Sequence, residues 1–200
     1  METSHTEIGG EALKPGFALA ARLREAHLAV DACYQCKKCS SGCPLTFAMD
    51  LLPDQVIRLA LLGQEDLVLR ATTPWVCSSC ETCTTRCPNG IDIAGVMDWL
   101  KEEALRRGYA VPQEQVSRFH QSFLEAVRLG GGRLSEPLLL GLYSIKSGKT
   151  LEKLKSGELK EEILLGWELA RRGRLRLRPP KRLKGAPEIA RMFQAAQERP

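Results

Sequence analysis

The stretches CYQCKKCSSGCP (residues 33–44) and CSSCETCTTRCP (residues 77–88) contain every cysteine of this 200-residue chain. Both stretches follow the pattern C-x2-C-x2-C-x3-C-P, and the second is the first moved by 44 residues. The cysteines are Cys33, Cys36, Cys39, Cys43, Cys77, Cys80, Cys83 and Cys87. An internal repeat of this kind predicts two copies of one cysteine-bound centre.

Three kinds of chemistry use cysteines in groups of four. Disulfides need an oxidising compartment, and the N-terminal residues carry no apolar run typical of an export signal. Structural zinc takes four tetrahedral ligands, usually as two pairs separated by a longer loop, which does not explain three cysteines at two-residue gaps. An iron–sulfur cube does explain them, because the short loop brings three thiolates to three irons and the fourth iron needs a thiolate from elsewhere. The spacing therefore predicts two [4Fe–4S] clusters.

The fourth cysteine of each run is expected to cross to the other cluster, as in two-cluster ferredoxins that carry this pattern. The first cluster would then be held by Cys33, Cys36, Cys39 and Cys87. The second would be held by Cys77, Cys80, Cys83 and Cys43. Since all eight thiols are used, none remains as a nucleophile or a redox dithiol. The chain is expected to transfer single electrons without a catalytic residue of its own, so whether it should be called an enzyme depends on its complex.

Charged residues near the cysteines suggest an order of potentials. Lys37 and Lys38 lie in the first binding loop, and crossing would bring Arg86 to the first cluster, whereas Glu81 lies in the second loop. Nearby positive charge favours the reduced, more negative cube. These residues predict that the first cluster has the higher potential.

Outside the cysteine runs, apolar residues recur at helical spacing. Helices are expected over residues 53–62, 93–108, 116–127 and 158–171. Asp92 should cap the second of these helices, and Ile163 and Trp167 should face the interior from the fourth. No convincing set of strands appears. The prediction is an all-α protein with a helical C-terminal extension.

The chain is expected to have three parts. Residues 1–27 form an N-terminal segment, residues 28–111 form the core that binds the two clusters, and residues 112–200 form a helical extension that docks on a companion chain.

Eight Lys or Arg residues and no acidic residue lie between 171 and 184, so the net charge of +5 belongs to this segment. It lacks interleaved aromatic residues, which argues against nucleic acid and leaves anionic lipid, an acidic protein surface or a solvated strip. No segment is long and apolar enough to span a bilayer, and the chain is expected in the cytoplasm.

The sequence resembles the C subunit of heterodisulfide reductase, an iron–sulfur electron-transfer subunit. The resemblance covers roughly residues 28–193 and rests on the two cysteine runs, with PDQVIRLALLG (53–63) between them, and on three downstream segments. Those segments are RFHQSFLEAV (118–127), GRLSEPLLLGLY (132–143) and PPKRLKGAPEIARMF (179–193). One departure is Lys37, where the family usually has glycine, and it puts the backbone of that loop in question.

The resemblance implies an α-helical ferredoxin fold and an electron relay. In that family the C subunit takes electrons from the flavin-containing A subunit, or from another donor, and delivers them to the B subunit, whose CCG motifs bind the clusters that cleave the disulfide. No CCG motif occurs here, so catalysis would lie in a separate chain. Three alternatives stay open: the iron–sulfur subunit of a quinone-linked dehydrogenase, a free-standing ferredoxin, and a metal-stabilised interaction protein without redox function. The sequence names neither the disulfide nor the donor.

Overall fold

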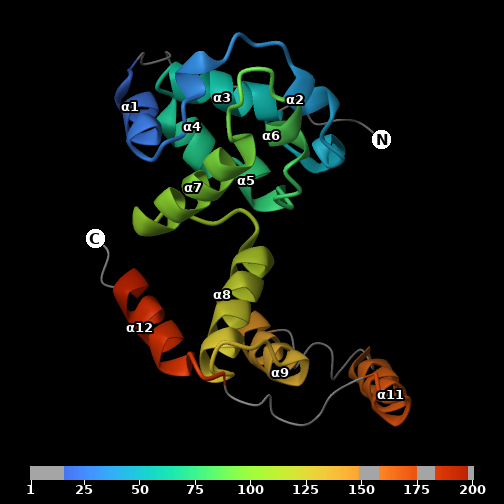
Figure 1. The fold of residues 1–200 in the computed structure, drawn as a ribbon. Coiled ribbons are helices and arrows are strands. Elements are labelled where there is room, and N and C mark those ends of the chain that lie inside the picture. The colour runs from blue at the N-terminus through green and yellow to red at the C-terminus, as the bar shows by residue number, and fades with distance from the viewer. Residues whose placement is uncertain (1–15, 149–157, 175–182, 198–200) are drawn as a thin grey trace. The chain divides into compact units, whose positions relative to one another are not determined.

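A computed structural model describes residues 16–148, 158–174 and 183–197 (Figure 1). Every regular element in these ranges is a helix, so the predicted all-α class is confirmed. The helices are α1 (Ala18–Glu25), η1 (Val30–Ala32), α2 (Lys38–Ser41), η2 (Thr46–Ala48), α3 (Pro53–Leu61), α4 (Glu65–Arg70), α5 (Thr73–Val76), α6 (Thr82–Arg86), α7 (Ile93–Arg106), α8 (Glu114–Leu129), α9 (Glu136–Ser147), α11 (Glu158–Arg171) and α12 (Ala186–Gln197). No helix among the described residues has the length and apolar character needed to cross a membrane.

The chain divides into two units, residues 1–113 and residues 114–200. The cysteines all belong to the first unit, and α8 to α12 belong to the second. The division of the chain into a cluster-binding core and a docking extension concerns function and stays a prediction. Most of the basic segment 171–184 lies outside the described residues, since 175–182 are not among them.

The core of the first unit forms between α1, α3, α4, α5 and α7. Its fully buried side chains are mostly aliphatic: Leu19, Leu23, Val30, Val56, Ile57, Val68, Leu69, Met97 and Leu100. Two helix starts agree with their sequence signals. Pro53 is the first residue of α3, and the Asp92 carboxylate accepts a hydrogen bond of 2.8 Å from the Gly95 N–H at the start of α7. The predicted helices at 53–62 and 93–108 are therefore confirmed to within two residues.

A buried carboxylate joins α1, α4 and α7. Glu103 is 4% exposed, and its oxygens accept from Arg22 at 2.7 Å and from both Arg106 and Arg107 at 2.6 Å. Glu65 on α4 is also paired with Arg107, at 3.0 Å, and with Arg22. A buried charge is tolerated only when it is paired and hydrogen-bonded, as Glu103 is here. This network of ion pairs connects α1, α4 and α7.

A second carboxylate, Asp50, connects the segment before α3 to the start of α5. It accepts hydrogen bonds from the Thr72 N–H at 2.7 Å, the Thr73 N–H at 2.9 Å and the Thr73 hydroxyl at 2.7 Å, and also from the Leu51 N–H. Burial works against its charged form, but these donors outweigh burial and lower the pKa of Asp50 below the usual 3.8. Because α5 leads directly to Cys77, Asp50 helps to place the second cysteine run.

The second unit buries little apolar surface in its described part. Where α8 packs on α9, the buried residues of α8 are small: Ser117, Ser122 and Ala126. The apolar residues that predicted α8 lie outward, with Phe119, Phe123 and Leu124 between 38% and 55% exposed. The prediction that Ile163 and Trp167 face the interior is wrong, because they are 63% and 70% exposed on α11. Helical spacing identifies the residues that share a face, but it does not say whether another element covers that face.

We expect Asp50→Asn to lower the free energy of unfolding by about 1–2 kcal/mol, since the charged acceptor for three backbone N–H groups is lost. Stability from a lowered pKa is present above the unfolded pKa and is lost as pH falls through the folded value. The difference should therefore stay constant between about pH 6 and 8. Urea unfolding followed by circular dichroism measures it, with the exposed Glu25→Gln as control. A difference that changes across this pH range would contradict the assignment.

Candidate functional site

The eight thiols gather around two cavities in the first unit. One cavity is lined by Cys33, Cys36, Cys39 and Cys87. The other is lined by Cys43, Cys77, Cys80 and Cys83. The structure thus groups three cysteines of one run with the last cysteine of the other run, in both directions. This grouping has the composition of the two predicted ligand sets, while the ligation itself stays a prediction.

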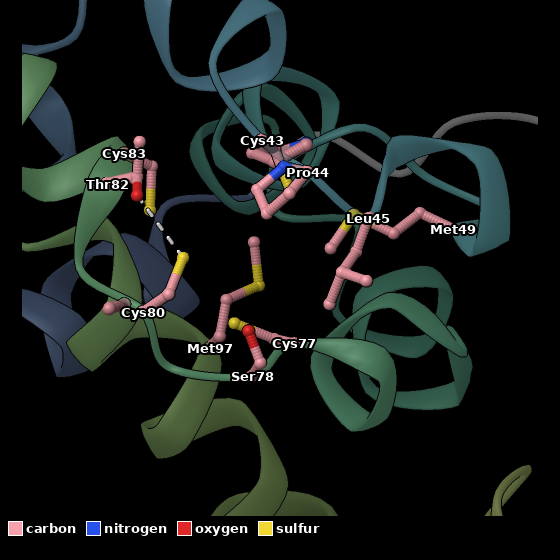
Figure 2. A pocket seen from close by; sticks show the side chains of 12 residues that line it. Cys43, Pro44, Leu45, Met49, Cys77, Ser78, Cys80, Thr82, Cys83 and Met97 are labelled. Carbon is pink, nitrogen blue, oxygen red and sulfur yellow. Dashed lines mark hydrogen bonds between the residues drawn. The ribbon is translucent and has the colours of Figure 1, made fainter.

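Figure 2 shows how separate elements contribute to the second of these cavities. Cys77 and Cys80 lie in the loop before α6, Cys83 lies on α6, and Cys43 follows α2. The remaining lining is largely apolar and includes Leu45, Met49, Pro53, Ala94 and Met97. Because α2 and α6 are in contact, the end of each cysteine run lies beside the other run.

The first cavity differs from the second in having charged residues among those that line it. It is formed by the loop before α2 together with residues of α3 and of the segment that leads into α7. Ile57, Ile91 and Ile93 supply apolar side chains, whereas Gln35, Lys37 and Asp54 supply polar ones. Asp54 is only 6% exposed. A buried carboxylate therefore lies at one cysteine-lined cavity.

The two binding loops share an unusual backbone. Gln35 and Lys37 in the first loop have φ of 61° and 62°, and Ser79 and Glu81 at the matching positions of the second have φ of 50° and 60°. Left-handed conformations at such residues cost energy and are seen mainly where the surroundings require them. In the first loop this backbone lets the Gln35 N–H donate to the Cys33 sulfur, at 3.4 Å. The internal repeat of the sequence is thus also a repeat of backbone geometry.

Lys37 explains the departure noted in the sequence. Its left-handed φ is one that glycine adopts without cost, so the loop keeps the backbone that a glycine would have there. Glu81 does the same at the matching position. The lysine therefore takes a conformation that glycine would adopt freely at this position.

The thiols differ in burial. Burial raises the pKa of Cys83 to about 11 and also raises the pKa values of Cys39 and Cys77. By contrast, Cys36 and Cys80 are exposed, and a hydrogen bond to Thr82 lowers the pKa of Cys80. The exposed thiols are the second cysteine of each run. Each cavity therefore has one thiol at the protein surface and three that are less exposed.

The residues present fit an iron–sulfur cube at each cavity. A cube needs four thiolates around a space, apolar walls and backbone N–H groups that face sulfur. Each cavity offers four thiols and several apolar side chains, and the Gln35 N–H already faces a cysteine sulfur. Within the described ranges, no three Cys, His, Asp or Glu side chains converge as one metal ion would require. The thiols surround a space instead.

Sequence reasoning missed two charged residues of this region. Asp54 shares a helical face with Ile57, three residues later, and Lys101 shares one with Met97 and Ala104. Lys101 is 8% exposed, and its ammonium group lies 2.8 Å from Asp98, whose carboxylate accepts from the Ser79 hydroxyl at 3.1 Å. For both residues, the signal in the sequence was a charged residue whose helical spacing places it on an apolar face.

The chain matches a known domain family over its cysteine-rich part. Residues 29–91 match the family described as a 4Fe-4S dicluster domain. The match spans both three-cysteine loops and both cysteines that precede proline. The iron–sulfur assignment therefore does not rest on spacing alone.

Comparison with characterised proteins gives consistent relatives that are named as C subunits of heterodisulfide reductases. The C subunit of the ferredoxin:CoB-CoM heterodisulfide reductase of Methanosarcina mazei is 33% identical over 140 residues, which are 67% of this chain and 86% of that protein. The iron-sulfur C subunit of the CoB–CoM heterodisulfide reductase of Methanopyrus kandleri is 34% identical over 82 residues, which are 41% of this chain and 43% of that protein. The C subunit of the H(2):CoB-CoM heterodisulfide,ferredoxin reductase of Methanothermobacter marburgensis is 32% identical over 80 residues, again 43% of its length. The chain thus spans less than half the length of the latter two relatives.

We expect Lys37→Gly to be more stable than Lys37→Ala by about 1 kcal/mol, because both remove the charge and only glycine adopts the left-handed φ without strain. Urea unfolding of the iron-loaded protein, followed by its visible absorbance, measures the difference. Glu81→Gly and Glu81→Ala form a second pair at the matching position. Equal stability within both pairs would show that the loops do not hold this conformation.

Proposed function

We propose a function that starts from the family to which this chain belongs, the C subunits of heterodisulfide reductase. In this proposal the chain relays single electrons between two [4Fe–4S] clusters inside a larger reductase complex. The observation that carries the proposal is the pair of cavities, each lined by three cysteines of one run and one of the other. Because each site takes one thiol from the other site's run, the two clusters would be neighbours. The family assignment supports a complex, and the paired cavities support a relay.

The chain's own residues would do three things for the clusters. Cys33, Cys36, Cys39 and Cys87 would hold one cube, and Cys77, Cys80, Cys83 and Cys43 the other. When bound, each cube accepts and releases one electron. Apolar side chains such as Ile57 and Met97 would keep water from the inner side, while the exposed Cys36 and Cys80 would leave an edge of each cube near the surface. Each edge is a place where an electron can enter or leave.

Bond cleavage would take place in a different chain of the complex. All eight thiols are committed in this scheme, and the sequence contains no CCG motif. The partner that receives electrons would be a catalytic chain with CCG motifs, like the B subunit, and the donor a flavin-containing iron–sulfur chain, like the A subunit. Support comes from the relatives, which are named as subunits of reductases that act on the CoB-CoM heterodisulfide. The disulfide used by this chain's own complex is a separate question.

The second unit would serve as the docking arm. Its helix α11 exposes four large apolar side chains, Ile163, Leu164, Leu165 and Trp167, each at least 59% exposed. On α9, Leu140 and Ile145 are also exposed. A group of large exposed apolar side chains on one helix often marks a surface that another protein covers. The occupant we propose is a neighbouring chain of the reductase complex.

Crossed ligation predicts that Cys87→Ser disturbs the same cluster as Cys33→Ser, although the two residues belong to different runs. EPR of the reduced variants would show the same altered signal in both, with the other cluster intact. Cys77→Ser and Cys43→Ser should form the second matching pair. If Cys87→Ser instead matches Cys77→Ser, ligation is not crossed. Wild-type protein with far fewer than eight irons and eight sulfides per chain would end the proposal of two clusters.

The docking proposal predicts that Trp167→Ser lowers recovery of companion chains by about tenfold, since exposed aromatic anchors carry much of an interface's binding energy. The tagged full-length chain would be purified anaerobically from its own cells, and companion chains identified by mass spectrometry. Glu161→Ala, on the same helix, is the matched control. Unchanged recovery of a CCG-containing chain with Trp167→Ser would contradict the docking role. Unchanged visible absorbance of the variant would show that its clusters are intact.

A further inference from the structure

The two cysteine-lined cavities are built alike, and this allows their walls to be compared residue by residue. The Ser40 hydroxyl accepts from the Asp54 N–H at 3.0 Å, and the Thr84 hydroxyl accepts from the Ala94 N–H at 3.2 Å. Asp54 is the second residue of α3, and Ala94 is the second residue of α7. Ser40 and Thr84 each follow the third cysteine of a run. Asp54 and Ala94 therefore occupy matching positions.

The matching positions carry different charge. Asp54 and Ile57 line the cavity of Cys33, whereas Ala94 and Met97 line the cavity of Cys77. Asp54 is 6% exposed and accepts a hydrogen bond from the Ser40 hydroxyl. Within the described residues no Lys or Arg forms an ion pair with it. One cavity thus has a buried carboxylate where the other has a methyl group.

The second cavity has a buried charge of the opposite sign nearby. Lys101 is 8% exposed and is tied through Asp98 to Ser79 in the loop between Cys77 and Cys80. Asp98 carries the opposite charge, but 54% of its side chain is exposed, whereas only 10% of the Lys101 side chain is exposed. The buried charge near the first cavity is therefore negative, and the buried charge near the second is positive.

We propose that Asp54 holds the cluster of Cys33, Cys36, Cys39 and Cys87 at the lower potential and that Lys101 holds the other at the higher one, so that a single electron resides on the cluster of Cys77. Reduction adds negative charge to a cube that is already anionic with its four thiolates, so a carboxylate beside it disfavours the reduced state and an ammonium group favours it. The proposal rests on the proposed function, because it assumes that both clusters are present.

This order is the reverse of the one that Lys37, Lys38 and Arg86 predict. Those three side chains belong to exposed residues, where water and salt screen their charges. Asp54 and Lys101 are buried, where the same charge acts through a lower dielectric constant. On this basis we expect the two buried charges to set the order of potentials and the exposed charges to modify it less.

Asp54 also has a possible structural role, and the test must separate the two. An acidic side chain in the first turn of α3 interacts favourably with the helix dipole. That role changes stability when it is lost, but it does not change how an electron is shared between two clusters. Asp54→Asn keeps a side-chain oxygen for the Ser40 hydroxyl and removes only the charge. Asp54→Ala reproduces the residue at the matching position.

The test is the partition of one electron between the clusters in anaerobically loaded full-length protein, read by EPR during a redox titration. The signals are assigned with the cysteine variants described above. In the wild type the electron should lie mainly on the cluster of Cys77. Asp54→Asn should move the equilibrium about tenfold toward the cluster of Cys33, which is about 59 mV for one electron. Lys101→Met should move it in the same direction, and the exposed Glu102→Gln on α7 should leave it unchanged.

The failures can be told apart. Two intact clusters with the electron on the Cys33 side in the wild type would overturn the inference alone, as would an unchanged partition in both Asp54→Asn and Asp54→Ala. Changed stability with unchanged partition would assign Asp54 to the helix start only. Wild-type protein that loads only one cluster would overturn the proposed function and this inference with it.

Discussion

The structure depends on one arrangement: each cavity is completed by a thiol that its own loop does not supply. Three cysteines of a run lie close together in the chain, and the fourth residue of each set comes from the other run, which is displaced by 44 positions. The two runs must therefore lie side by side, which the contact between α2 and α6 achieves. The arrangement of α3 and α7 follows, since the second residue of each helix bonds to the hydroxyl beside the third cysteine of a run. Carboxylates at Asp50 and Glu103 then fix the surrounding helices.

The loops show how a repeated geometry tolerates different side chains. Lys37 and Glu81 have opposite charges and the same left-handed backbone. What the loops share is the direction of their N–H groups and sulfurs, which the chemistry of a cube requires. What differs is the charge presented to solvent and to the cavity walls. Duplication preserves the loop geometry and leaves the charged side chains free to vary, so two similar sites acquire different electrostatic surroundings.

Much of the first unit could be predicted from the sequence. The eight cysteines, Asp92 as a cap and Pro53 at a helix start all act through contacts within a few residues, or through a spacing that permits few chemistries. For Asp54 and Lys101 the helical spacing places a charge on an apolar face, but their burial depends on packing against helices distant in sequence, which spacing alone does not give. Ile163 and Trp167 were misplaced for the same reason. Their helix was predicted with its observed bounds, but no described element covers their face.

The exposed sulfurs of Cys36 and Cys80 have a consequence for the sensitivity of the clusters to dioxygen. They are the second cysteines of their runs, so both sites open to water at the same point of the repeat. A cube bound there would be reachable by dioxygen along the route that serves an electron donor. Dioxygen would then oxidise both clusters of the isolated chain. A neighbouring protein that covers these edges would protect the clusters from dioxygen and also exchange electrons with them.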